Sequence, residues 1–500
     1  MTSRRAAPIG AGSGGQTPDP RRWRILAVSQ IAGFMSLLDV SIVNVALPSI
    51  QSGLGASAGA VQWVVSGYAL TFGLALVPAG RLGDALGRRR MFLVALTAFV
   101  LTSALAGAAP TAGWLVAARL AQGLAGGMLN PQNAGLIQDL FHGAERGRAF
   151  GVFGATVGVS TAVGPVAGGV ILALSGPDDG WRWVFLVNVP IGVVALALAA
   201  RLLPRQAASG PVVPRLDFAG AGLLGGAVLA ALLPLVQAEN GGLRRLWWLF
   251  CVSVVLFVAF ARWELRMARR GRSPLLDPRL LTETDGYPAG AAIGLCYFIG
   301  FTGIWLVLAL FFQRGLGYSP LRSGLSVTPF ALGSAVSAAV GGRLVSRLGR
   351  RITVAGLVLV ALGLTATAVV LVVTGGTAAG LAAALPLLVA GVGGGLVISP
   401  NITLTLQSVP ARMAGAAGGA LQTGQRIGAA VGTAVLASVY YGVLAGTGDA
   451  HTAVGVALAG AVAVTLLALG LAVADLLREL RRQRRARCDA DHVRGHEHWF

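Results

Sequence analysis

Long apolar stretches recur along this chain, and they constrain its fold more than any other feature. A helix that crosses about 30 Å of hydrocarbon at about 1.5 Å per residue needs about 20 apolar residues. The composition agrees with this pattern, because 55% hydrophobic and 12% charged residues fit no soluble class of protein. We therefore predict an all-α polytopic membrane protein with fourteen spanning helices, at 25–48, 61–80, 91–109, 112–137, 149–173, 183–203, 216–237, 246–262, 288–312, 325–342, 352–374, 380–401, 413–441 and 452–477.

The basic residues predict how these helices are oriented. All 39 are Arg, and the chain has a formal charge of +20. If both termini are cytoplasmic, 32 of these residues lie in cytoplasmic segments and 5 in external ones, as the positive-inside rule requires. We therefore expect a multi-pass protein of a bacterial inner or plasma membrane with both termini in the cytoplasm. Charge spread over many loops also argues against nucleic-acid binding, which needs basic residues gathered on one face.

One ten-residue segment occurs twice. Gly80–Arg89, after the second apolar stretch, is repeated as Gly342–Arg351, at an offset of 262 residues, after the tenth. Internal repeats of this kind build the two bundles of secondary transporters, which move against each other around a central site. The predicted organisation is therefore a cytoplasmic tail at 1–24, a six-helix bundle at 25–203, two inserted helices at 204–262, a cytoplasmic linker at 263–287, a second six-helix bundle at 288–477 and a basic cytoplasmic tail at 478–500.

Six short motifs carry a family resemblance. In chain order they are Leu38–Pro48, Gly80–Arg90, Arg119 with Gln122 and Gly123, Gly164–Gly169, Trp181–Pro190 and Gly317–Pro320. On these motifs the chain resembles the major facilitator superfamily, and within it the fourteen-helix drug:proton antiporters. The resemblance implies two six-helix bundles plus an inserted helix pair, and export of amphipathic drug-like or antibiotic-like molecules in exchange for protons. It also implies that the only small-molecule partners are the organic substrate and protons, with no cofactor beyond the proton gradient, and we expect a monomer in the lipid bilayer.

Charged residues inside the hydrocarbon are costly, so each of them is a candidate functional residue. Three qualify in this chain: Asp39, Arg119 and Arg426. Asp39 and Arg119 lie at a similar depth, roughly 10–14 Å below the outer surface by the helical rise, and the resemblance associates the Arg119 motif with proton coupling. A neighbouring Arg favours an ionised carboxylate whereas desolvation favours the protonated acid, so closing the cavity could change the protonation of Asp39. A static ion pair, or a structural hydrogen bond with Asn44, is the alternative interpretation.

Three further groups of residues are predicted from the motifs and from polar positions in the spans. A substrate cavity would be lined by Asn44, Gln122, Asn130, Asn133, Gln422 and Arg426. A conformational latch would involve Gly80, Arg81, Asp84, Gly87 and Arg88. The second copy of the repeated segment has Ser346 in place of Asp84. The antiporter motif would use Gly164, Pro165, Gly168 and Gly169 to pack closely against another helix. The alternatives are an ordinary basic loop for the second group and a structural packing face for the third.

Other functions are weighed against this interpretation. An ATP-driven pump is not expected, because no glycine-rich phosphate loop is followed by Lys and Ser or Thr. An enzyme is not expected either, because the spans contain no His, metal-binding pair or nucleophilic serine motif. No metal site is predicted, and the His residues of the tail receive no role. Arg426 stands where several drug antiporters carry an acid, which argues against strongly cationic substrates. The main alternative is a transporter with one narrow physiological substrate, such as a self-made metabolite, a sugar or an amino acid; a channel or a receptor is a weaker one.

Overall fold

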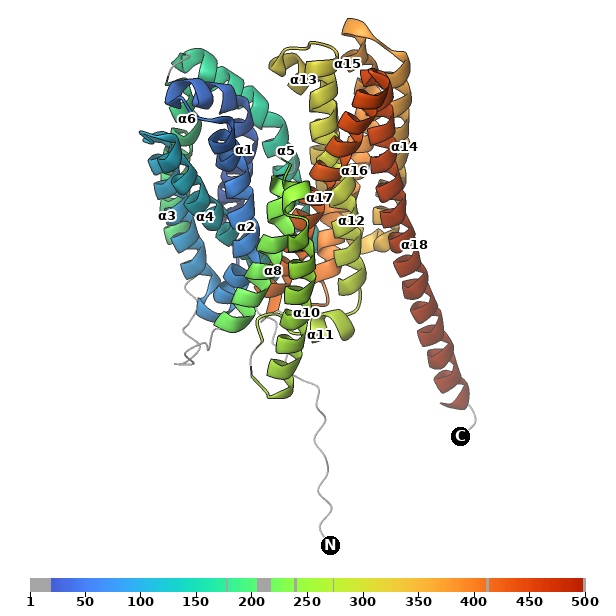
Figure 1. Cartoon of the computed structure of the whole chain (residues 1–500). Helices are drawn as coiled ribbons and strands as arrows, with labels where there is room; N and C mark the ends of the chain where they lie inside the picture. The colour runs from blue at the N-terminus through green and yellow to red at the C-terminus, as the bar shows by residue number, and fades with distance from the viewer. Residues whose placement is uncertain are drawn as a thin grey trace.

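The computed structural model describes residues 19–176, 179–204, 217–237, 241–272, 274–410 and 413–497. Within these residues the secondary structure is entirely helical, and two bundles stand side by side (Figure 1). The first bundle is blue to green in Figure 1 and the second is yellow to red. The all-α class predicted from the sequence is therefore confirmed for the described residues.

The first bundle contains six long helical segments. They are α1 (Arg22–Leu54), α2 (Ala58–Leu86), α3 (Arg88–Gly107), α4 (Ala112–Leu140), α5 (Gly143–Ser175) and a sixth segment divided into α6 (Gly180–Leu186) and α7 (Asn188–Leu202). Side-chain caps define two of the starts, because the Ser57 and Thr111 oxygens accept hydrogen bonds from backbone N–H groups in the first turns of α2 and α4.

The second bundle follows an inserted segment. The insertion contains α8 (Phe218–Val236), α9 (Gly242–Arg245) and α10 (Trp248–Arg269), and the short α11 (Arg279–Thr282) follows. The second bundle contains α12 (Tyr287–Leu310, continued by a π-helical turn over Phe311–Gly315), α13 (Pro320–Leu348), α14 (Arg350–Val373), a 3₁₀ turn (Gly376–Ala378), α15 (Ala379–Ala382), α16 (Ala384–Leu406), α17 (Ala414–Thr447) and α18 (Ala450–Glu497).

Twelve helical segments of the described residues are long and apolar enough to cross a membrane. The two predicted spans outside this set are α4 and α5. Arg119 and several amide side chains lower the mean hydropathy of α4. In α5 the side chains of residues 161, 162 and 165 lie outside the described part of the structure, so only Val166–Ser175 is counted, as a shorter apolar helix. Length and composition therefore support a polytopic membrane protein but do not confirm the count of fourteen.

Several helices extend beyond the apolar stretches that predicted them. The stretch at 325–342 becomes Pro320–Leu348, and the stretch at 452–477 becomes Ala450–Glu497, which extends past the bundles at the lower right of Figure 1. Hydropathy detects only the part of a helix that matches hydrocarbon, whereas Arg, Glu and Leu also favour helix in water. At such ends the predicted spans therefore stop before the helices do.

The two bundles meet along two helix–helix contacts, which we call the first and the second seam. Glycine allows the helices to approach closely at both. At the first seam α2 packs against α17, and a Cβ on Gly80 would lie 2.2 Å from the carbonyl oxygen of Gly415. At the second seam α13 packs against α5, and a Cβ on Gly342 would lie 2.4 Å from the carbonyl oxygen of Gly147. Gly80 and Gly342 occupy the same position of the repeated segment. Both copies of the repeat therefore bring the two backbones into direct contact.

Candidate functional site

A buried ion pair lies at the centre of the first bundle. Asp39 on α1 and Arg119 on α4 are 2.5 Å apart, measured from carboxylate oxygen to guanidinium nitrogen, and their side chains are 0% and 1% exposed. The structure thus brings together the two residues that the sequence placed at one depth. Pairing is what allows either charge to be buried, because an isolated charge in this setting would be strongly unfavourable.

Amide and hydroxyl side chains complete the hydrogen bonding of Asp39. Its second carboxylate oxygen accepts from the amide nitrogens of Gln122 and Asn188, each at 3.1 Å. The same two amide nitrogens donate to the hydroxyl of Ser103, at 3.0 and 3.1 Å, and this hydroxyl donates to the carbonyl oxygen of Phe185. Side chains from α1, α3, α4 and α7 therefore form one connected network, which we call the Asp39 cluster: Asp39, Ser103, Arg119, Gln122 and Asn188.

Arg119 is also held by the backbone and by aromatic rings. Its Nε donates to the carbonyl oxygen of Val64 on α2 at 3.0 Å, and one Nη donates to the Gln122 side-chain oxygen at 2.7 Å. The Tyr68 ring lies 4.2 Å from the guanidinium carbon, and the Phe185 ring lies 5.5 Å from it, which adds cation–π attraction. The guanidinium thus keeps partners that do not depend on the charge of Asp39.

Only part of the bonding of Arg119 requires a charged Asp39. Protonation of Asp39 would remove the negative charge opposite Arg119 and turn an acceptor oxygen into a donor. The Asp39–Arg119 contact would weaken while the contacts of Arg119 with Val64 and Gln122 remained available. A neutral Asp39 would therefore leave Arg119 with its other partners.

Several members of the site were missed by the sequence analysis. Asn188 lies within the Trp181–Pro190 motif, which indicated the family but gave the residue no role. Ser103 and the carbonyl of Val64 lie in apolar stretches that offer no signal for a polar contact. Asn44, the alternative partner for Asp39, is exposed, and the amide that bonds to Asp39 belongs to Asn188.

Aromatic contacts connect this cluster to the first seam. Tyr68 and Phe72, one turn apart on α2, have ring centroids 5.9 Å apart. The guanidinium of Arg426, on α17 of the second bundle, lies 4.3 Å from the Phe72 ring centroid. A continuous series of contacts therefore runs from Asp39 through Arg119, Tyr68 and Phe72 to Arg426.

The residues predicted to line a substrate cavity occupy different environments. Gln122, Asn130 and Asn133 on α4 are buried, and Gln122 belongs to the Asp39 cluster. Asn44 is exposed on α1, and Gln422 and Arg426 are partly buried on α17. The two amide side-chain atoms of Asn133 have no hydrogen-bond partner among the described residues, so this side chain is one of the polar groups free to bind a ligand or water.

Asp84 joins the two bundles at the first seam. Its two carboxylate oxygens accept from the backbone N–H groups of Gly415 and Ala416, each at 3.0 Å. These are N–H groups of the first turn of α17, a helix whose own N-cap residue, Met413, makes no side-chain cap hydrogen bond. Asp84 thus caps a helix of the other bundle, where a negative charge also interacts favourably with the helix dipole.

Arg88 holds this carboxylate in place. It lies 3.0 Å from Asp84 and 2.6 Å from Asp139 at the end of α4. Of the other predicted latch residues, Gly80 makes the backbone contact with Gly415, Arg81 is partly buried, and Gly87 ends α2 with a φ of 97° that favours glycine.

The glycines of the antiporter motif pack within the first bundle. A Cβ on Gly164 would lie 2.2 Å from the Cβ of Ser41, and Gly168 faces Ile42 and Val45, so α5 lies close against α1. Gly169 has open space where a Cβ would lie. The side chain of Pro165 lies outside the described part of the structure.

The second copy of the repeat makes different polar contacts. Ser346, at the position of Asp84, is exposed. Arg350, at the position of Arg88, lies 2.7 Å from Asp475 on α18 and donates to the Asn401 side-chain oxygen on α16 at 2.7 Å. All of these partners belong to the second bundle. Arg88 also pairs within its own bundle, but one of its partners, Asp84, caps a helix of the other bundle.

Comparisons with known proteins agree with this architecture. Residues 31–433 match the family described as "Major Facilitator Superfamily". The chain is 38% identical over 437 residues to "Probable actinorhodin transporter" of Streptomyces coelicolor, covering 86% of this chain and 74% of that protein. It is 38% identical over 488 residues to "Puromycin resistance protein pur8" of Streptomyces alboniger, covering 91% and 92%. Among solved structures, the human organic anion transporter MFSD10 (TETRAN) superposes with a TM-score of 0.65 at 17% identity, covering 91% of this chain and 100% of that one.

Proposed function

This chain belongs to the major facilitator superfamily, and we propose on that basis that it exports amphipathic, antibiotic-like small molecules in exchange for protons. The relatives support the substrate class, because one is named as a probable transporter of actinorhodin and the other for resistance to puromycin. The observation that carries the proton coupling is the buried Asp39–Arg119 pair, a titratable group opposite a fixed cation inside the first bundle.

The proposed topology has fourteen spans with both termini in the cytoplasm. The lengths of α4 (29 residues) and α5 (33 residues) support two spans beyond the twelve apolar ones, and the distribution of 32 and 5 Arg residues supports the orientation. Reporter fusions after Gly271 and Leu480 should give cytoplasmic signals, and a fusion after Gly176 an external one. An external signal at either of the first two sites would refute this topology.

In this orientation the two seams close the cytoplasmic side of the protein. Gly80, Asp84 and Gly342 lie near the cytoplasmic ends of α2 and α13, so their contacts hold the bundles together on that side. The conformation therefore corresponds to an outward-facing state. For export, the seams must open so that substrate can enter from the cytoplasm, and they must close again for release outside.

A proton on Asp39 is the proposed trigger for this change. Protonation from outside loosens Arg119, and the aromatic contacts from Tyr68 through Phe72 transmit the change to Arg426 on α17. Because α17 is also the helix that Asp84 caps, its displacement weakens the first seam. Substrate that enters from the cytoplasm then favours release of the proton, so proton and substrate occupy the protein in turn.

Transport in everted membrane vesicles tests this function. Vesicles with the protein should accumulate antibiotic-like compounds when respiration acidifies their interior, and a protonophore should abolish the accumulation. Vesicles from cells without the protein provide the control. Accumulation that depends on ATP and resists the protonophore would refute proton antiport. Transport of a single metabolite, with no transport of any compound of a drug panel, would replace the proposed substrate class with a narrow one.

A further inference from the structure

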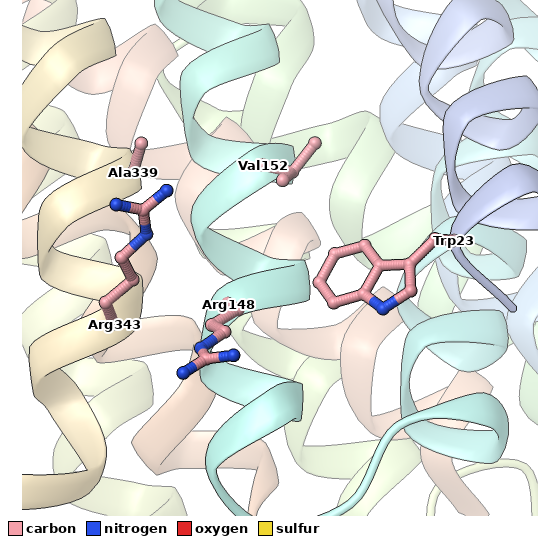
Figure 2. A pocket seen from close by; sticks show the side chains of 5 residues that line it. All are labelled: Trp23, Arg148, Val152, Ala339 and Arg343. Carbon is pink, nitrogen blue, oxygen red and sulfur yellow. The ribbon is translucent and has the colours of Figure 1, made fainter. Parts of the chain in front are cut away.

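A pocket lies beside the second seam, away from the Asp39 cluster and the Asp84 contacts. It has a volume of about 470 Å³ and is lined by Trp23, Arg148, Val152, Ala339 and Arg343 (Figure 2). This volume is within the range of sites that bind small ligands. Trp23 is at the start of α1, Arg148 and Val152 are on α5, and Ala339 and Arg343 are on α13, so the walls come from both bundles.

The two arginines flank the direct contact between α5 and α13. Gly147 and Gly151 pack against Gly342, and each arginine is the next residue in the chain after one of these glycines. Figure 2 shows Arg148 and Arg343 extending from the two facing helices on one side of the pocket, with the ring of Trp23 on the other. Closing this seam therefore brings two guanidinium groups of opposite bundles to one pocket.

Neither arginine has an acidic partner in the part of the chain that the structure describes. Glu145, one turn before Arg148 on α5, already accepts two hydrogen bonds from Arg22, at 3.0 and 3.1 Å, one on each carboxylate oxygen. At the second seam, Ser346 occupies the position of the repeated segment that Asp84 occupies at the first. Two like charges without a counter-charge oppose the approach of the helices, so an anion in the pocket would favour closure.

The other walls of the pocket fit a lipid better than a free anion. Trp23 is 39% exposed and its ring packs edge-on against Phe141, with centroids 4.9 Å apart. Trp is enriched at the membrane interface, and Val152 and Ala339 offer an aliphatic surface beside it. Basic pockets between spanning helices on the cytoplasmic side bind anionic lipid headgroups, and guanidinium groups match phosphate oxygens in pairs.

The two seams also differ in what covers them. The inserted helix α8 packs on both α2 and α17 and covers the first seam, through Leu224, Val228 and Leu232. At the second seam Arg148, Val152 and Arg343 are exposed. A lipid of the adjacent leaflet can therefore reach the second seam from the side.

We propose that this pocket binds an anionic phospholipid of the cytoplasmic leaflet, with its phosphate between Arg148 and Arg343 and its glycerol and acyl chains along Val152 and Trp23. The phosphate supplies at the second seam the negative charge that Asp84 supplies at the first. Bound lipid thereby stabilises the state in which the cytoplasmic side is closed. The leaflet depends on the orientation proposed above, whereas the lipid site itself depends on neither the transported substrate nor proton coupling.

Lipid binding to the purified full-length protein in detergent tests the proposal. Native mass spectrometry would measure the affinity for phosphatidylglycerol and for phosphatidylcholine, and a thermal melt would measure the stabilisation by each. Phosphatidylglycerol should bind more tightly and raise the melting temperature more. Replacing both arginines, Arg148→Gln with Arg343→Gln, should weaken phosphatidylglycerol binding by about 30-fold, the effect expected for losing two basic side chains near a membrane surface.

A matched control removes the same charge elsewhere. Arg269→Gln with Arg270→Gln, at the exposed end of α10, should leave the affinity within about twofold of the original protein. Equal affinity of the pocket variant and the original protein would overturn the proposal. Equal binding of the two lipids would overturn it as well. If inorganic phosphate stabilised the protein as much as phosphatidylglycerol does, the pocket would be assigned to a free anion instead. The comparisons among the two lipids and phosphate use the unmodified protein, so they decide the question even if the double variant does not fold.

Discussion

The two seams between the bundles share a backbone contact and differ in charge. Gly80 and Gly342 hold the same place in the repeated segment, and each brings its helix against a glycine of the opposite bundle. Within the described ranges of the chain, the first seam alone adds a carboxylate, Asp84, which caps α17, and this seam is the one that α8 covers. The repeat thus reproduces the close approach of the helices in both halves, whereas the carboxylate that caps a helix of the opposite bundle belongs to one half.

The arginines of the repeat differ in the same way. Arg88 bonds to Asp84 and so supports a contact between bundles, whereas Arg350 bonds to Asp475 and Asn401 within one bundle. Each arginine therefore supports its own bundle, Arg88 through Asp139 and Arg350 through Asp475, and Arg88 also holds the carboxylate that contacts the other bundle. The substitutions below separate these roles.

Adding a methyl group at either seam glycine should have the largest effect. Gly80→Ala and Gly342→Ala each place a Cβ within 2.4 Å of a backbone oxygen, so the bundles cannot approach as closely at that seam, which the proposed topology places on the cytoplasmic side. Transport should fall to near background, as measured by efflux at matched membrane abundance. Gly442→Ala on α17, which has open space for a Cβ, is the control and should retain full transport. Full transport by both seam variants would show that these contacts do not form in the cycle.

Removing the charge at the first seam should have the next largest effect. Asp84→Asn replaces charge-assisted hydrogen bonds, worth about 1.5–3 kcal/mol, with weaker ones, so the closed state loses roughly tenfold or more in population. Transport should fall by about that factor while membrane abundance stays largely unchanged. Ser346→Ala makes the matching change at the second seam and should have no effect. Normal transport by Asp84→Asn would reduce the motif to an ordinary basic loop.

Replacing the arginine of each copy should give different kinds of loss. Arg350→Gln leaves the partly buried Asp475 without its cation and should lower the melting temperature by several degrees, because breaking such a pair is costly. Transport per folded molecule should change by less than about twofold. Arg88→Gln should lower the melting temperature and transport together. Thermal melts and efflux assays on the same preparations distinguish these outcomes, and matching losses in the two variants would remove the proposed asymmetry.

Trimming the helix that covers the first seam should have the smallest effect. Leu232 on α8 is 3% exposed and contacts the apolar cluster of α2 and α8, so Leu232→Ala should lower the melting temperature by a few degrees and transport slightly. Leu229→Ala on the same helix removes a side chain that is 38% exposed and should be neutral. Equal effects of the two substitutions would indicate that α8 does not support the seam through this face.

The sequence predicted an all-α polytopic membrane protein and placed Asp39 and Arg119 at one depth, because hydropathy and helical rise are local properties. The count of fourteen spans and the domain bounds stay predictions. It did not predict Ser103 or Asn188 as partners of the ion pair, since their positions in apolar helices do not reveal which face meets α1 and α4. The partner of Asp84 could not be found either. It is a pair of backbone N–H groups more than 300 residues away, which have no side-chain signature.

The pocket at the second seam shows a related limit. Arg148 and Arg343 fit the positive-inside pattern, which explains each of them separately and gives no reason to place them together. Only the packing of α5 against α13 brings them to one cavity. An arginine that sets the membrane orientation and an arginine that binds a ligand therefore cannot be told apart until the helices are placed relative to one another.

The most direct test of proton coupling is transport by Asp39→Asn in proteoliposomes with an imposed pH gradient. The account predicts that this variant loses proton-driven transport but retains downhill exchange of substrate, because the asparagine cannot release a proton. Ser103→Ala, which removes a hydrogen bond of the cluster without a titratable group, should retain proton-driven transport. Normal proton-driven transport by a well-expressed Asp39→Asn protein would contradict the account. If Asp39→Asn and Ser103→Ala lost only stability, and to the same extent, the ion pair would be a structural element.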